Sequence, residues 1–216
     1  FQPGVDTGRQ TMNTFSGFVL DRYIAREKID VRKTCLWEYF REVFGYGDVS
    51  HPQFRFILNL IAWTRQFPRI RTERIVLLVS KGEGTGKSFI FQILNMIFKG
   101  YTAFHDTLST YITRFNYSDN SKLIIFVDDI FGAGQAETSK IFAKITATQQ
   151  QYEKKGETKV TFDEFSNVWI TSNQERGALH IKPQDRRQLI FKVSNRKLRN
   201  RAFFKKCSEE TKNLNI

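Results

Sequence analysis

The feature that most constrains the fold is an apolar run that leads into a glycine-rich segment and then into a helix-forming stretch. Ile75–Val79 is continuously apolar, as expected for a strand buried on both faces of a sheet. Ser80–Ser88 follows with three glycines, and 88–99 has apolar residues at helical spacing, with Gly100 as a stop signal. The sequence therefore predicts a strand, a tight loop and a helix in direct succession.

A loop of this kind suits a phosphate group. Glycines let successive backbone N–H groups turn inward, and a helix N-terminus adds free N–H groups and partial positive charge. We expect Lys87 to reach the β and γ phosphates of ATP, and Ser88 to ligate Mg²⁺. The residues expected to hold the nucleotide are Gly82, Glu83, Gly84, Thr85, Gly86, Lys87 and Ser88. Lys81 stands where the strict motif has a glycine, and a ligand-free strand–helix turn is the alternative interpretation.

Two further apolar runs end in polar side chains. Leu123–Val127 is followed by Asp128 and Asp129, and Asn167–Thr171 precedes Asn173. Carboxylates at the carboxyl edge of a sheet can hold Mg²⁺ and orient or deprotonate an attacking water. We assign Asp128 to the metal, Asp129 to the water, and Asn173 to the γ-phosphate or the same water. A simple turn is the alternative interpretation for Asp128-Asp129 and for Ser172-Asn173.

Apolar strands alternate with helical stretches along the chain, which predicts an α/β fold with a largely parallel sheet. Residues 20–45 and a helix from Pro52 to Pro68 predict a small helical region before the sheet. The apolar face of that helix would include Phe56, Leu58, Ile61 and Trp63. The expected division is an N-terminal arm and helical subdomain (1–68), a core (69–195) and a basic tail (196–216).

Positive charge is in excess. With 34 Lys and Arg against 22 Asp and Glu, the net charge is +12, which favours a polyanionic partner, nucleic acid before membrane. Gln150–Phe162 predicts a hairpin whose Lys154, Lys155 and Lys159 would neutralise DNA phosphates, and Tyr152 beside them could stack on a base. A solvated basic surface is the alternative, and it is the favoured one for the tail.

Cysteine spacing and hydropathy bear on the cellular compartment and on membrane association. Cys35 and Cys207 lack the spacing of a zinc site, and we interpret them as buried or incidental residues in a reducing compartment. No apolar run approaches the ~18–20 residues that span a bilayer, and no signal peptide is visible. We expect an intracellular protein of viral or mobile-element origin with no membrane partner. The chain begins at Phe1, so we expect a fragment of a longer protein.

Five segments occur in a characteristic order over most of residues 13–193. They are Asn13–Phe18, Gln66–Pro68, Gly82–Ser88, Tyr152–Gly156, and Ser172-Asn173 followed by Asp185-Arg186-Arg187. This order resembles that of superfamily 3 helicases, an AAA+ ATPase type of DNA viruses, phages and plasmids. The resemblance is greatest to the helicase domain of phage-, plasmid- and poxvirus-type primase-helicases.

The resemblance implies an AAA+-type P-loop NTPase core, a homo-hexameric ring with ATP between subunits, and movement along single-stranded or forked DNA during replication. A linked primase domain is a further implication. The matched residues are Lys87 and Ser88 (Walker A), Asp128 and Asp129 (Walker B), Asn173 (sensor), Arg187 or Arg186 (arginine finger, with Arg187 preferred), and Lys154 and Lys155 (hairpin tip). The chain departs from the pattern at Lys81, and at Asp129, where many relatives have Glu.

Three other functions stay open from the sequence. The chain could be an ATP-switched DNA-binding initiator or assembly protein without processive unwinding. It could be an RNA-directed viral NTPase, or a basic α/β domain that binds no nucleotide.

Overall fold

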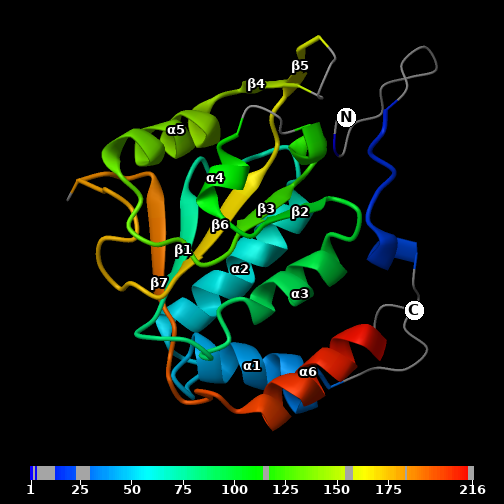
Figure 1. Ribbon diagram of the computed structural model, residues 1–216. Helices are drawn as coiled ribbons and strands as arrows, with labels where there is room; N and C mark the ends of the chain where they lie inside the picture. The colour runs from blue at the N-terminus through cyan, green and yellow to red at the C-terminus, as the bar shows by residue number, and fades with distance from the viewer. Residues whose placement is uncertain are drawn as a thin grey trace.

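A computed structural model of the chain describes residues 1, 3, 13–22, 30–113, 117–153, 158–182 and 184–213 (Figure 1). The α-helices are α1 (Cys35–Val43), α2 (Pro52–Gln66), α3 (Phe89–Ile97), α4 (Leu108–Tyr111), α5 (Gln135–Thr146) and α6 (Arg201–Asn213). Three short 3₁₀ helices are η1 (Val19–Arg22), η2 (Val31–Lys33) and η3 (Tyr117–Asp119). The strands are β1 (Ile75–Val79), β2 (Thr102–His105), β3 (Ile124–Val127), β4 (Gln149–Tyr152), β5 (Val160–Asp163), β6 (Asn167–Ser172) and β7 (Gln188–Lys192).

Five strands form one sheet in the order β2-β3-β6-β1-β7, and every neighbouring pair is parallel. The expected mixed α/β fold with a mostly parallel sheet is therefore confirmed. Strands β3, β6 and β1 are adjacent in the sheet, so their carboxyl ends, which carry the polar side chains singled out above, lie side by side along one edge. This arrangement brings chain segments that are far apart in the sequence to a single place.

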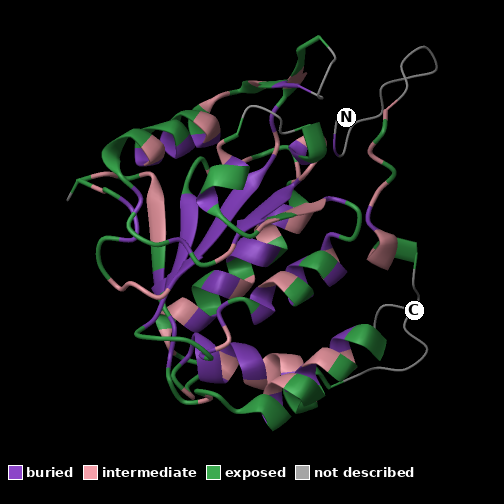
Figure 2. Ribbon diagram, viewed as in Figure 1, coloured by how far each residue is buried: buried purple, intermediate pink, exposed green. Residues whose placement is uncertain are grey.

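Helices cover both faces of the sheet (Figure 1). Alternate residues of β1 point to opposite faces, as the two-residue period of a strand requires. Val76 and Leu78 pack with α1, α2, α3 and α6, whereas Ile75, Leu77 and Val79 pack with α4 and α5. Figure 2 shows the central strands buried throughout, and all five residues of β1 are at most 3% exposed. Burial on both faces explains why this strand is apolar without alternation.

The N-terminal helices share their core with the sheet. Tyr39 of α1 and Ile57 of α2 belong to the same buried cluster as Val76. The apolar face predicted for α2 was wrong in part: Phe56 is 47% exposed, and the buried face carries Phe54, Ile57, Leu60, Ile61 and Thr64. Because α2 is apolar on most sides, its sequence did not single out the face that packs.

The β4–β5 pair is the predicted hairpin, with Gln149 opposite Asp163 in an antiparallel register. Lys154 and Lys155 lie outside the described residues. Tyr152, expected to be available for stacking on a base, is instead 3% exposed, and its hydroxyl donates to Glu164 (2.5 Å). Burial, together with this carboxylate, raises the pKa of Tyr152 above its usual value. The tyrosine therefore packs within the protein, bonded to Glu164, and is not a contact residue.

The basic C-terminal segment forms α6, which packs against α1. Phe203, Cys207 and Thr211 are its buried residues. Cys207 forms a disulfide with Cys35 at the start of α1, with the Cα atoms 5.1 Å apart. Both cysteines are buried, but they are bonded to each other, so the interpretation of the pair as merely buried or incidental was wrong. Nothing in their spacing along the chain indicates the bond. The Glu210 carboxylate also accepts the Cys35 N–H (2.8 Å) and caps α1.

Within the part of the chain that the structure describes, no helix combines the length and the apolar character needed to cross a bilayer.

We expect reduction of the Cys35–Cys207 disulfide to lower the free energy of unfolding by about 2–4 kcal/mol. The bond joins residues 172 apart and so restricts the unfolded chain. Denaturant unfolding with and without a reductant measures the effect. The Cys35→Ser variant should be destabilised without reductant, and reductant should then change nothing further. A wild-type transition that does not respond to reductant would contradict the disulfide.

Candidate functional site

The glycine-rich loop joins β1 to α3 at the carboxyl edge of the sheet, as the sequence predicted. Gly82, Gly84 and Gly86 have φ angles of +94°, +77° and +94°, a region that other residues rarely adopt. Gly86 is also closely packed, because a Cβ there would lie 2.5 Å from the ring of Phe204. The course of this loop therefore requires glycine for both its backbone and its packing.

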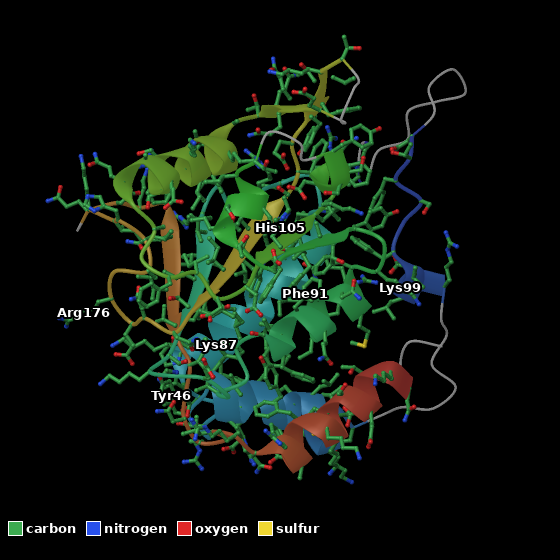
Figure 3. All side chains as sticks on the ribbon, in the orientation of Figure 1. Tyr46, Lys87, Phe91, Lys99, His105 and Arg176 are labelled. Atoms are coloured by element: carbon green, nitrogen blue, oxygen red, sulfur yellow. A yellow bond between two sulfur atoms is a disulfide. The ribbon has the colours of Figure 1, made fainter. Side chains whose placement is uncertain are left out.

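Lys87 is near the end of the loop, two residues before α3 begins, and lies beside the ends of the central strands (Figure 3). Its side chain is folded back over the loop and is only 6% exposed. The ammonium donates to Ser80 Oγ (2.5 Å), to the carbonyl oxygen of Gly82 (3.2 Å) and to Asn173 Oδ1 (2.7 Å). Burial lowers the pKa of Lys87, while the charges of Asp129 and Asp128 oppose that shift. Lys87 and Asn173, predicted to share a site, are thus in direct contact.

The two carboxylates that follow β3 have different partners. Asp128 Oδ1 accepts hydrogen bonds from Ser88 Oγ (2.7 Å) and Thr171 Oγ1 (2.5 Å). Asp129 Oδ1 accepts one from Asn173 Nδ2 (2.8 Å). Asp129 has φ +46°, a left-handed conformation that is costly for a residue with a side chain. The turn directs one carboxylate toward the start of α3 and the other toward the end of β6.

Thr171 is a site residue that the sequence analysis missed. Its Oγ1 donates to Asp128 and accepts the backbone N–H of Asp129 (2.7 Å), so it fixes the turn that separates the two acids. The sequence does show a hydroxyl at the carboxyl end of a buried strand. That strand, β6, lies next to β3, which the two acids follow. Only the strand order made that signal meaningful.

A cavity of about 320 Å³ opens between these groups. It is lined by Glu83, Gly84, Thr85, Gly86, Lys87, Ser88, Phe89, Asp128, Asp129, Thr171, Asn173 and Phe204. The structure therefore brings together the loop residues from Glu83 onward, both acids and Asn173. Gly82 contributes its carbonyl oxygen to Lys87 but does not line the cavity.

The oxygen donors at this edge fit Mg²⁺ bound to a nucleotide. Ser88 and Asp128 present a hydroxyl and a carboxylate in contact with each other. Magnesium in such sites takes one or two carboxylates and completes its shell with water and substrate phosphates. Among the described residues, no group of three or more His, Cys, Asp or Glu forms a dedicated metal cage.

Arg186 and Arg187 lie away from the cavity. Ile75, the first residue of β1, donates its N–H to the carbonyl oxygen of Arg187 (2.9 Å), so the arginine pair lies at the opposite edge of the sheet. The Arg187 guanidinium donates twice to Asp185 (3.0 and 2.7 Å) and lies 4.0 Å from the ring centroid of Phe142. These hydrogen bonds hold the pKa of Asp185 below its usual value. Within one chain, neither arginine reaches the site.

Of the three lysines predicted to contact DNA, Lys159 is within the described residues. It is exposed, immediately before β5, and lines a second cavity of about 330 Å³ between the hairpin and α5, with Lys140 and Lys144. The hairpin leads into the amino end of β6 and so is remote from the glycine-rich loop (Figure 1).

The fold is similar to that of solved structures of the C-terminal region of NrS-1. One, an apo structure in the A form, has 19% sequence identity and a TM-score of 0.70, covering 88% of this chain and 47% of that chain. A second apo structure, of residues 305–718, has 17% identity and a TM-score of 0.66, covering 88% of this chain and 49% of that chain. This chain thus spans about half the length of the chains it matches. At these identities the likeness shows the fold alone.

A sequence search among curated proteins finds no match. A family model described as a family of unknown function, DUF5906, matches residues 78–187, which is 110 of the 216 residues. The matched segment contains the glycine-rich loop, the two carboxylates and Asn173. The chain is therefore a member of the DUF5906 family.

Proposed function

We propose that this chain is an ATP-hydrolysing P-loop domain that works on DNA as a helicase or translocase, in the replication of a virus, phage or plasmid-like element. The observation that carries the proposal is the contact chain from Lys87 through Asn173 to Asp129, with Ser88 and Asp128 beside it. A cation, an amide, a hydroxyl and two carboxylates from three strand ends line one cavity. This is the set of groups that phosphoryl transfer to water requires.

The phosphate end of the site is formed by the loop and the start of α3. Backbone N–H groups of the loop and the Lys87 ammonium would bind the β and γ phosphates. Ser88 and Asp128 would hold Mg²⁺, which when bound neutralises developing charge on the phosphate oxygens. Lys87 now donates to Asn173, so a bound phosphate would take over this hydrogen bond and leave Asn173 Oδ1 free for the attacking water.

The water end of the site is formed by Asp129 and Asn173. The Asp129 carboxylate would accept a proton of the water as the water oxygen attacks the γ-phosphorus. The bond from that phosphorus to the bridging β-phosphate oxygen breaks, and ADP leaves. The Asn173 Nδ2 hydrogen bond holds that carboxylate in place (2.8 Å). Because Thr171 fixes the backbone of Asp129, it positions the base without touching the water.

A homo-oligomeric ring, hexameric by resemblance, would explain the position of Arg187. At the opposite edge of the sheet it can serve only the cavity of a neighbouring subunit, where an arginine would stabilise charge in the transition state. Asp185 would hold the guanidinium ready through its two hydrogen bonds. The DNA partner is inferred from the net charge of +12 and from the lysine-bearing hairpin.

Lys87→Ala should lower ATP hydrolysis by about 10²–10³-fold, because the preorganised positive charge at the phosphates is lost. Steady-state phosphate release measures the rate. Lys81→Ala is the matched control, since Lys81 is in the same loop, is exposed and does not line the cavity. Equal losses in the two variants would contradict the assignment of Lys87.

The two acids should respond differently to amide substitution. Asp129→Asn should bind ATP but hydrolyse it about 10²-fold or more slowly, because the base is lost. Asp128→Asn should instead raise the Mg²⁺ concentration needed for half-maximal activity, because a metal ligand is lost. Single-turnover hydrolysis across a Mg²⁺ titration separates the two effects. If both variants shift the Mg²⁺ requirement alike, the division of roles is wrong.

Lys155→Ala and Lys159→Ala should each weaken single-stranded DNA binding without regard to sequence. Each should reduce the slope of log affinity against log salt by about 1, because one phosphate contact is removed. Fluorescence anisotropy across a salt series measures the slope. Lys99→Ala is a suitable control, because Lys99 is exposed at the end of α3, away from the hairpin (Figure 3). A slope changed equally by all three substitutions would argue against the hairpin.

A forked duplex then separates the candidate functions. A helicase displaces the annealed strand in an ATP-dependent reaction, whereas an ATP-switched initiator or assembly protein binds the fork without displacing it. RNA that competes more strongly than DNA of the same sequence would favour the RNA-directed alternative.

A further inference from the structure

Another cavity, of about 600 Å³, adjoins the one that holds the predicted phosphate site. The two cavities share Glu83, Gly84 and Phe204, and the second adds Arg199 and Arg201. The open space therefore continues from the phosphate end of the loop across the start of α6. No residue of this C-terminal segment was expected to take part in nucleotide binding.

The C-terminal segment is closely fitted to the loop. The Arg199 N–H donates to the carbonyl oxygen of Gly84 (2.8 Å), and a Cβ on Gly84 would lie 3.0 Å from Arg199 Cγ. On the neighbouring turn, a Cβ on Gly86 would overlap the ring of Phe204. Arg199 itself has φ +53°, a left-handed conformation. These contacts fix α6 against the loop at a separation that only glycines permit.

Phe204 lines both cavities. Its ring lies 5.9 Å from that of Phe89, which also lines the phosphate site, yet Phe204 is only partly buried. A partly exposed aromatic ring beside two guanidinium groups suits a planar heteroaromatic ligand with an anionic tail. Stacking on an aromatic side chain stabilises a bound base, and arginine adds cation–π and ionic contacts.

We propose that Phe204, flanked by Arg199 and Arg201, forms the subsite for the base of the nucleotide whose phosphates occupy the glycine-rich loop. The base stacks on Phe204, and the guanidinium groups border the base and the sugar. The Glu83 carboxylate, which lines both cavities, is placed to accept a hydrogen bond from a ribose hydroxyl. This subsite rests on the proposed nucleotide binding, and it assigns α6 a direct part in it.

The subsite is preorganised by the contacts that hold α6 on α1. Cys207 follows Phe204 by one helical turn and is bonded to Cys35, and Glu210 caps the same end of α1. The Tyr39 hydroxyl of α1 also donates to the carbonyl oxygen of Gly86 (3.0 Å), and a Cβ on that glycine would lie 3.5 Å from the Tyr39 ring. Helix α1 and the start of α6 thus both hold the loop in place. This fixed packing reduces the entropy lost when a base binds.

The test compares ATP with inorganic tripolyphosphate, which has the phosphates but no base. Wild-type protein with Mg²⁺ should bind ATP about tenfold or more tightly than tripolyphosphate, as expected for one stacked base. Phe204→Leu should lose about tenfold in ATP affinity and keep its affinity for tripolyphosphate, and Phe204→Tyr should restore ATP binding. Isothermal titration calorimetry measures both ligands.

Phe131→Leu is the matched control, because Phe131 is 81% exposed and lines neither cavity. It should leave both affinities unchanged. Equal wild-type affinity for the two ligands would overturn the base subsite, whether or not the Leu variant folds. Equal loss of both ligands in Phe204→Leu would also overturn it, since the ring would then act only through the shape of the loop. Wild-type protein that binds neither ligand would instead refute the proposed nucleotide binding.

Discussion

The site depends on one nearly buried cation. Placing the Lys87 ammonium out of water is unfavourable unless hydrogen bonds replace the lost solvent. Ser80 Oγ, the Gly82 carbonyl oxygen and Asn173 Oδ1 supply them, from the end of β1, the loop and the end of β6. The negative charge of Asp129 further offsets the cost of burial. The conformation of the loop and the position of the Asn173 amide are therefore set by the same requirement.

This requirement can be met because of the strand order. With β6 between β3 and β1, the residue that follows each of the three strands lies at one edge of the sheet. A side chain at the end of β6 can then contact both neighbours, as Asn173 does with Lys87 and Asp129. If β6 were at the edge of the sheet, the amide could reach one of them at most. The strand order is thus the structural cause of the polar cluster.

The parts of the site that could be predicted from the sequence are those with a local signal. A strand buried on both faces is a continuous apolar run, and a backbone that needs positive φ is marked by glycine, so β1 and the loop were predictable. The polar ends of β3 and β6 were predictable for the same reason. Thr171 could not be assigned a role, because a hydroxyl at a strand end acquires meaning only from the neighbouring strand.

Contacts between distant segments had no signal at all. Cys35 and Cys207 are 172 residues apart, and their pairing follows from the packing of α6 on α1. Phe204 could not be singled out, because it lies in a basic tail whose composition favoured a solvated helix. The Phe204 ring packs against Gly86. From the sequence, backbone conformation alone was a sufficient reason for a glycine at that position. The second constraint on that glycine, the ring lying against it, is visible only in three dimensions.

The residues that could be predicted from the sequence are those proposed to act on phosphate and water. The residues that could not be predicted are mainly those proposed to contact the base. The segment that matches the DUF5906 model, 78–187, contains the loop, the two acids and Asn173, which would act on phosphate and water. Arg199, Arg201 and Phe204 lie outside it, and they are the groups proposed to border the base. Phosphate groups are alike in every nucleotide, whereas bases differ. Under the proposed function, the segment 78–187 would bind what all nucleotides share, and the start of α6 would bind the part in which they differ.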